Sequence, residues 1–354
     1  MATSGNFVQL HNHTHYSLLD GASKIPDLVK RAKELNMPAV GITDHGNMHG
    51  AYEMWSTAVK EGVKPIIGIE AYVTPETARQ DQTRVSWDTN WNPDIDPQHR
   101  RRNPNDVSGG GLITHLTMWA ETDEGLVNLM KASTDANLEG RVMRYPRMDK
   151  EILAKYSKGI IASSGCPSGI IQTRLLLGQF DEALRAAGEL QDIFGRDNFY
   201  IEFMDHGLKI EKQVTDGLLD IAKKLNAPLL ATNDSHYVRA EDAGSQDAML
   251  CINSGSTLDE PGRFKFDGTG YYLKSAEEMR ELFKDIPEAC DNTLEIAERC
   301  NVMFDDHEDG AFMPQFDCPE GWDETSLFLR KVEEGLEQRY DGHPPIEVLK
   351  QADY

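Results

Sequence analysis

Nine side chains of the kinds that bind divalent metals stand at or just after the ends of short apolar runs in this sequence. They are five histidines, two aspartates, one glutamate and one cysteine: His11, His13, Asp20, His45, Glu70, His115, Cys166, Asp234 and His236. Imidazole, thiolate and carboxylate together are the ligand set of zinc and similar transition metals. Nine ligands exceed one tetrahedral shell, so the set indicates two or three ions if the carboxylates bridge.

The spacing of these residues favours convergence on one centre. His11 with His13, and Asp234 with His236, are separated by two positions in predicted strands, and such pairs point to the same side of a strand. Asp44 directly precedes His45, and we predict that it orients this histidine. Each motif alone has an ordinary explanation: buried or surface histidines, a turn-capping aspartate, a buried cysteine before Pro167. Their joint occurrence at six of seven predicted strand ends favours a metal site.

The elements that would position these side chains alternate along the chain. Apolar runs predict strands at 7–13, 39–43, 65–73, 112–120, 159–165, 199–204 and 228–234, mostly with helical patterns between them. Such alternation predicts parallel strands with helices outside, and seven units suit a closed (β/α) barrel. Active sites of these barrels form at the carboxyl ends of the strands, where the nine residues gather.

Two regions depart from this rhythm. Residues 74–110 are polar and rich in turn-forming residues, which predicts a surface insertion, with Arg100, Arg101 and Arg102 in a solvated loop. From about residue 270 the pattern becomes helical, and Ser275 with Glu278 forms a predicted capping box. We place the domain boundary near 285, giving a barrel of residues 1–285 and a helical extension of residues 286–354.

Charge and composition exclude several classes of protein. The chain has 36 basic and 59 acidic residues, a net charge of −23, which excludes a diffuse electrostatic grip on nucleic acid. A local device such as bound metal must therefore attract any phosphate. We find no apolar run of the ~18 residues that a spanning helix needs and no secretory signal, so we expect a cytoplasmic protein without a membrane partner. The five cysteines form no CxxC pair, which favours reduced thiols.

Several long strings resemble one known family. LHNHTHYSLLDGA (10–22), GITDHGNMHGAYE (41–53), KPIIGIEAYV (64–73), SSGCPSG (163–169) and ATNDSHY (231–237) are similar to the PHP (polymerase and histidinol phosphatase) domain. Within that family they resemble the form at the N-terminus of bacterial DNA polymerase III alpha subunits. The resemblance covers nearly all of residues 5–285 apart from 74–110. Residues 286–354 resemble the incomplete start of a polymerase body, so the polymerase active site would lie outside this chain.

The resemblance implies a distorted seven-stranded (β/α) barrel, similar to a TIM barrel, that holds up to three divalent metals. By position, the first metal would bind His11, His13, Glu70 and Asp234. The second would share Glu70 and add His115 and Cys166, and the third would bind Asp20, His45 and His236. Some family members have lost several of these ligands and are inert, whereas all nine positions here are occupied by competent ligands.

The implied activity is metal-dependent phosphodiester hydrolysis, specifically 3′–5′ exonuclease proofreading in which hydroxide generated on metal attacks the phosphorus. The residues assigned to catalysis are Asp234, Glu70, His13 and Asp44. Zinc fits the histidines and Cys166, while manganese fits the mixed oxygen and nitrogen set. The implied partners are the 3′ end of a DNA primer, the remainder of the polymerase chain and other replicase subunits. Two alternatives remain: a docking module for a separate proofreading subunit, with structural metal, and a small-molecule phosphatase.

Overall fold

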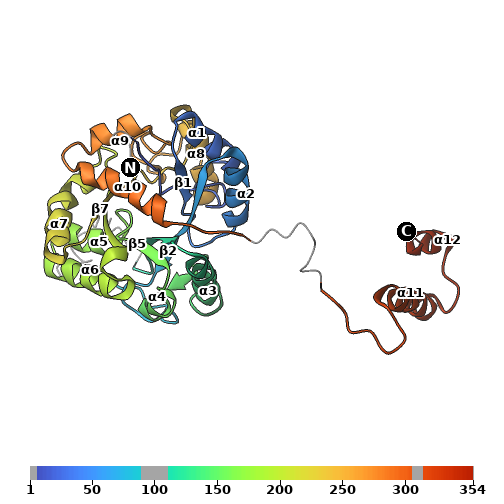
Figure 1. Cartoon of the computed structure of the whole chain (residues 1–354). Coiled ribbons are helices and arrows are strands. Elements are labelled where there is room, and N and C mark those ends of the chain that lie inside the picture. The colour runs from blue at the N-terminus through green and yellow to red at the C-terminus, as the bar shows by residue number, and fades with distance from the viewer. Residues whose placement is uncertain (1–5, 89–110, 305–313, 354) are drawn as a thin grey trace. The chain divides into compact units, whose positions relative to one another are not determined.

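The computed structural model describes residues 6–88, 111–304 and 314–353 (Figure 1). The chain divides into two compact units, residues 1–304 and 305–354. The boundary expected near 285 falls inside the first unit, because helix α10 (Pro287–Arg299) packs against strand β7 (Leu229–Ala231). Asn292 of α10 donates a hydrogen bond of 2.7 Å to the carbonyl oxygen of Leu229. The residues Arg100 to Arg102 lie outside the described part of the chain.

The first unit is built around one mixed sheet whose strands follow the order β1-β2-β3-β5-β6-β7, with β4 paired to β2. The remaining strands are β1 (Ala39–Ile42), β2 (Lys64–Val73), β3 (Thr114–Ala120), β4 (Arg147–Met148), β5 (Ile160–Ser163) and β6 (Phe199–Phe203). The number of strands agrees with the prediction, but their membership differs. The short β4 was not predicted, and residues 7–13 form isolated bridges instead of a strand.

Strand β3 corrects the expectation of parallel strands throughout, because it runs antiparallel to both β2 and β5. The segment after β2 returns the chain to the end of the sheet that it has just left, so Thr114 pairs with Val73. His115 therefore lies at the beginning of its strand. It still reaches the same end of the sheet as the carboxyl ends of the parallel strands, where the other candidate ligands lie.

The N-terminal segment closes the sheet into a distorted barrel, as predicted. Gln9 bridges Val40 of β1, and Asn12 bridges Ser235 just after β7. The Gly41 amide donates to the Gln9 carbonyl oxygen (2.8 Å). A Cβ atom at Gly41 would lie 2.6 Å from the Leu10 carbonyl oxygen, so this close approach requires glycine. The closing segment thus has the β1 side of the sheet on one flank and the β7 side on the other, and it joins these two edges by single bridges.

Helices surround the sheet, and their apolar faces pack against it (Figure 1). Besides α10 they are α1 (Ile25–Glu34), α2 (Ala51–Glu61), α3 (Asp123–Glu139), α4 (Lys150–Tyr156), α5 (Ile170–Leu176), α6 (Phe180–Phe194), α7 (Lys209–Leu225), α8 (Ala243–Ser254) and α9 (Ala276–Leu282). Ser275 caps α9 by accepting from the Glu278 amide at 3.2 Å, which confirms the predicted capping box. The second unit contains α11 (Glu324–Tyr340) and α12 (Ile346–Ala352).

Buried apolar side chains fill the middle of the barrel, so it is not a pore. They include Val8, Leu10, Ile66, Trp119, Ile161 and Leu230. The indole N–H of Trp119 donates to the Leu10 carbonyl oxygen (3.0 Å), which ties β3 to the closing segment. A site for ligands is therefore confined to the ends of the barrel.

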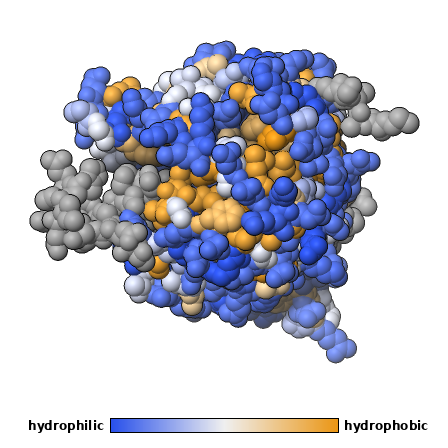
Figure 2. Space-filling view, turned by 90° about the vertical axis from the view of Figure 1, so that its left-hand side faces the viewer, coloured by the Kyte–Doolittle hydropathy of each residue, from blue (hydrophilic) through white to orange (hydrophobic). Residues whose placement is uncertain are grey.

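The surface on the side that carries α6 and α7 is mostly hydrophilic, with an apolar area near its centre (Figure 2). The part of the insertion that the structure describes is anchored, since Trp87 is buried and lies 4.2 Å beneath the guanidinium of Arg174. Within the described ranges, none of the helices combines the length and the apolarity that crossing a membrane would require.

Candidate metal centre

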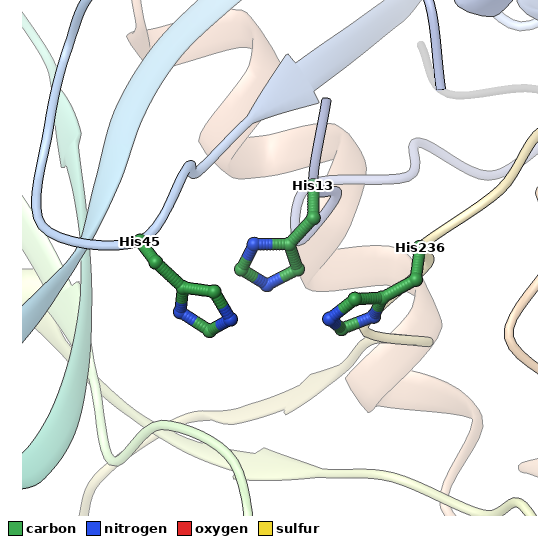
Figure 3. Close-up of side chains that lie close together, drawn as sticks. All are labelled: His13, His45 and His236. Carbon is green, nitrogen blue, oxygen red and sulfur yellow. The ribbon is translucent and has the colours of Figure 1, made fainter. Parts of the chain in front are cut away.

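Three imidazoles from distant parts of the sequence converge at one end of the barrel (Figure 3). His13 belongs to the closing segment, His45 follows β1, and His236 follows β7. The His13 ring centroid lies 4.1 Å from that of His45 and 4.3 Å from that of His236. One nitrogen of each ring lies within 4.8 Å of the others, so a single ion could bind all three.

Glu70 of β2 occupies the middle of the cluster and is 1% exposed. Its Oε2 lies 2.6 Å from Nδ1 of His45 and 3.5 Å from Nε2 of His13. Its Oε1 lies 3.1 Å from Nδ1 of His115 and 3.5 Å from Nε2 of His11. One carboxylate is therefore placed to bridge between ions, because each of its oxygens faces different imidazoles.

The remaining three candidates complete the cluster. Oδ1 of Asp234 lies 2.9 Å from Nε2 of His13. Oδ2 of Asp20 lies 2.8 Å from Nε2 of His45 and 3.4 Å from Nε2 of His236. Sγ of Cys166 lies 3.3 Å from Nδ1 of His115. The structure thus brings all nine predicted side chains together, while their role as ligands stays a prediction.

Six buried ligand-type atoms in this cluster make no hydrogen bond of good geometry with the described residues, although some of them lie as close as 2.6 Å to one another. They are His11 Nε2, His13 Nε2, His45 Nδ1, Glu70 Oε1, Glu70 Oε2 and Asp234 Oδ1. Buried polar atoms without partners are rare and cost free energy. A divalent cation would satisfy lone pairs that face one another in this way. The donor set therefore fits bound metal.

The electrostatics of the site give Glu70 and His13 the protonation states that metal ligands need. Burial would lower the pKa of His11 and His45, but the acidic groups beside them raise it well above the usual value, so an ion would have to displace their protons. Burial alone would raise the pKa of Glu70, but the charges of His115 and His45 hold that pKa well below its usual range. Burial and the neighbouring His45 and His236 lower the pKa of His13 to about 3, so this imidazole is neutral. Burial, followed by the charges of Glu70 and Asp234, raises the pKa of the Cys166 thiol. Cys166 would therefore bind as thiolate only when a cation displaces its proton.

Glu202 of β6 supports the cluster, and the sequence interpretation missed it. The Nδ1–H of His11 donates to Glu202 Oε1 at 2.7 Å, which leaves Nε2 of His11 facing the centre. Thr232 donates to the same carboxylate oxygen (2.6 Å), and Ser163 donates to the other. This support fixes the tautomer and orientation of His11. The available signal was an acidic residue inside the apolar run FYIEF.

The prediction that Asp44 orients the His45 ring is wrong, because the two ring nitrogens of His45 face Asp20 and Glu70. Asp44 Oδ1 instead accepts from the Thr14 amide at 2.7 Å and from the Ser17 hydroxyl at 2.8 Å. Ser17 Oγ in turn lies 3.0 Å from Nδ1 of His13. Adjacent residues on an extended chain point in opposite directions, so the side chain of Asp44 points away from that of His45. Through Ser17, Asp44 supports His13 instead.

The comparison with protein families agrees with this geometry. Residues 9–206, more than half of the chain, match the family described as the PHP domain. The chain belongs to the PHP family. The match begins in the segment that closes the barrel and includes seven of the nine clustered side chains of this PHP chain; Cys166 is the last of the seven.

Curated relatives of this PHP chain are named DNA polymerase III subunit alpha. The chain is 49% identical over 354 residues to the one from Mycobacterium tuberculosis, with 100% of this chain and 29% of the relative covered. It is 52% identical over 335 residues to that of Saccharopolyspora erythraea, with 94% and 28% covered. It is 38% identical over 347 residues to that of Borreliella burgdorferi, with 96% and 28% covered. The PHP chain thus spans less than a third of the length of these relatives.

Among solved structures, one from Bifidobacterium adolescentis, provisionally named a metal-dependent phosphoesterase, is 17% identical and covers 79% of this chain and 96% of its own. Its TM-score is 0.39.

Proposed function

We propose that this PHP domain is a metal-dependent phosphodiesterase that removes nucleotides from the 3′ end of DNA. The observation that carries the proposal is the set of six buried donor atoms that face one another without hydrogen-bond partners. A purely structural domain would satisfy such atoms within the protein, because unpaired buried polar groups destabilise the fold. The names of the relatives point to DNA as the substrate, since a polymerase subunit works at a 3′ end.

Three groups of side chains support a centre with up to three ions. The ligand atoms within each group lie within 4.8 Å of one another: His11, His13 and Glu70; His45, Glu70 and His115; His13, His45 and His236. Asp234, Cys166 and Asp20 lie beside the first, second and third group, respectively. The five histidines and Cys166 favour zinc, whereas manganese would suit the carboxylate-rich part of the set. We propose two or three divalent ions, with zinc preferred.

Divalent metal would supply an activated water and would neutralise charge on the phosphate oxygens. The residues of this chain prepare the site for that chemistry. Glu70 and Asp234, which the nearby histidines keep ionised, bring negative charge to the place where cations must collect. Glu202 holds the proton on Nδ1 of His11, and Ser17 with Asp44 orients His13. Both rings then present Nε2 to the centre.

The experiment is the incubation of the 354-residue chain with single-stranded DNA labelled at its 3′ end. We expect release of labelled mononucleotide with zinc or manganese and none after chelation. Asp234→Asn is the matched control, because it keeps the size of a ligand and removes its charge. Release that persists in Asp234→Asn would identify a contaminating nuclease. No release with any divalent metal, from protein whose bound ions are confirmed by elemental analysis, would favour the docking module with structural metal.

In the larger context we propose that this chain is part of a replicative polymerase alpha subunit in the cytoplasm. Residues 286–354 would then begin the polymerase body, and its partners would be the primer 3′ end, the rest of that polypeptide and other replicase subunits. The identity of 49% over the whole length of the chain supports this context. The polymerase reaction itself would require residues outside the chain.

A further inference from the structure

Helix α8 (Ala243–Ser254) holds the loops that surround the metal centre. Its Gln246 donates to the backbone oxygen of Asp20 at 3.3 Å. The amide nitrogen of Asn253, at the end of the same helix, donates to the backbone oxygen of Leu19 at 3.3 Å. The amide oxygen of Asn253 accepts from Arg144 at 2.6 Å. The helix thus links the loop of one candidate ligand to an exposed arginine.

Arg144 stands at the end of a row of aromatic rings that starts at the metal centre. The ring of Tyr72 lies parallel to that of His45, with 5.9 Å between the centroids. The ring of Tyr145 meets Tyr72 edge-on at 5.0 Å, and the Arg144 guanidinium lies 5.3 Å from the centroid of Tyr145. The guanidinium is thereby fixed near the cluster.

Arg144 makes no ion pair with a carboxylate among the described residues, so its charge is available to an anion. Its hydrogen bond within the described residues goes to the neutral amide of Asn253. By contrast, Arg79, Arg185 and Arg263 each bind carboxylates directly. The interaction with the Tyr145 side chain, together with the charge of Asp20, raises the pKa of Arg144, so the cation persists. In a chain of net charge −23, such a cation beside the metal centre is a candidate phosphate contact.

An exposed aromatic ring occupies another part of the same rim. Phe264 is 60% exposed, and its ring lies 6.1 Å from that of Phe266. Phe266 in turn packs edge-on against His236 at 4.7 Å. The preceding Arg263 makes two hydrogen bonds of 2.6 Å to Asp247 of α8, so the loop is fixed by the same helix that holds Arg144. An apolar ring that is fixed yet exposed offers a surface for stacking.

We propose that Arg144 and Phe264 form a binding rim for single-stranded DNA, in which Arg144 contacts a phosphate and Phe264 stacks on a base. This inference rests on the proposed function, because it assumes that the strand ends at the metal centre. Single-strand binding combines cations along the backbone with aromatic rings that accept any base. The rim offers one of each, beside the cluster, in a chain that otherwise repels a phosphate backbone.

The test measures KM and kcat for single-stranded DNA labelled at its 3′ end, using the full 354-residue chain. We expect Arg144→Gln to raise KM about 10-fold with little change in kcat, and to reduce the salt slope by about 0.7. Phe264→Ala should raise KM about 10-fold, whereas Phe264→Trp, which keeps an aromatic ring, should have a KM close to that of wild type. Lys158→Gln is the matched control, because it removes one positive charge paired with Glu124 away from the rim. Unchanged KM in both rim variants would overturn the proposal.

A second substrate separates the rim from the metal centre. Bis(p-nitrophenyl) phosphate requires the ions but is too small to reach both rim residues, so its hydrolysis should be the same in wild type and rim variants. An equal loss on both substrates would mean that the variants disturb the metals, which would overturn the rim. If wild type cleaves no DNA, the proposed function fails. The rim is then tested by fluorescence anisotropy of labelled single-stranded DNA, where binding that is equal in wild type and both variants would refute it.

Discussion

Two buried charged groups of this protein, Arg147 and Glu70, differ in how their hydrogen-bonding atoms are satisfied. Both are essentially inaccessible, at 0% and 1% exposed. The guanidinium of Arg147 donates to four backbone carbonyl oxygens, those of Gly140 (3.2 Å), Leu112 (3.3 Å), Arg79 (2.7 Å) and Asp81 (2.8 Å). Both carboxylate oxygens of Glu70 have no hydrogen-bond partner in the described part of the chain. The backbone satisfies the charge of Arg147, whereas the charge of Glu70 is left to the ion that we propose.

The difference separates a structural charge from a functional one. Burying a charge is costly unless hydrogen bonds or counter-charges offset it. Arg147 meets that condition and ties together three places in the sequence, around residues 79–81, 112 and 140. Glu70 depends on the histidines around it, and the facing nitrogens of three of them, His11, His13 and His45, also lack partners. The metal-free centre therefore lacks the satisfied hydrogen bonds that surround Arg147.

The largest expected effect comes from removing the charge of Glu70. Glu70→Gln should reduce DNA hydrolysis about 1,000-fold or more, because a neutral amide is a poor bridging ligand. In chelator, the free energy of unfolding of this variant should fall below that of wild type, because the lowered pKa of Glu70 shows that the histidines stabilise its charge, and the substitution leaves them without this counter-charge. Hydrolysis rates and urea unfolding in chelator measure both quantities. A variant that keeps its hydrolysis rate would make Glu70 a structural group like Arg147.

Metal itself should stabilise the protein, because it would bind the folded state and not the unfolded one. At about 1,000 times the dissociation constant, one bound ion adds about 4 kcal/mol to the free energy of unfolding. Thermal unfolding with and without zinc or manganese should show this gain in wild type and a much smaller one in Glu70→Gln. Elemental analysis should find more than one ion per chain. One ion or none after saturation would contradict a multinuclear centre.

Arg147→Met tests the other half of the comparison. It removes the side-chain donors of four hydrogen bonds to backbone carbonyl oxygens, so we expect the free energy of unfolding to fall by about 3 kcal/mol. The metal content of the folded protein should not change, because no candidate ligand contacts Arg147 in the described structure. Arg141→Gln, an exposed arginine on the same loop, is the matched control and should have little effect. Equal stability of the two variants would mean that the Arg147 hydrogen bonds contribute nothing.

A smaller effect is expected where support is removed and ligands remain. Ser17→Ala removes the oxygen that lies between Asp44 and His13, so metal affinity should fall about 10- to 100-fold. Glu202→Gln should act similarly on His11, because an amide accepts its proton less strongly. Titration with metal, monitored by competition with a chromogenic chelator, gives the affinities. Wild-type affinity in both variants would show that the rings are held by packing alone.

The smallest effect should come from Cys166→Ser. Serine keeps the size of the side chain but stays protonated near neutral pH, so one weak ligand is lost. Because Cys166 lies beside a group that already contains His45, Glu70 and His115, we expect only a several-fold loss of zinc affinity. Manganese affinity should change less, since manganese prefers oxygen and nitrogen ligands. An equal loss for both metals would point to a packing defect.

The sequence was sufficient to predict the cluster because its ligands lie close to strand ends, and strand ends of a barrel meet in space. It was not sufficient for the direction of β3, because an apolar run carries no information about which way the strand runs. Asp44 was assigned to His45 from adjacency along the chain, yet its contact is with Ser17. Arg147 could not be predicted at all, because its four partners are backbone atoms that only the folded loops bring together.

The closing segment also determines when the metal centre can form during synthesis. The His13 amide bonds to the Ser235 carbonyl oxygen at 2.7 Å, so two ends of a long stretch of chain must meet. A ribosome adding about 5–20 residues per second needs on the order of 10–45 seconds to bridge that separation. Throughout that time His11 and His13 have been made, but neither β7 nor His236 exists to receive them. An ion that binds both His13 and His236 could therefore be held only after the barrel has been made through residue 236.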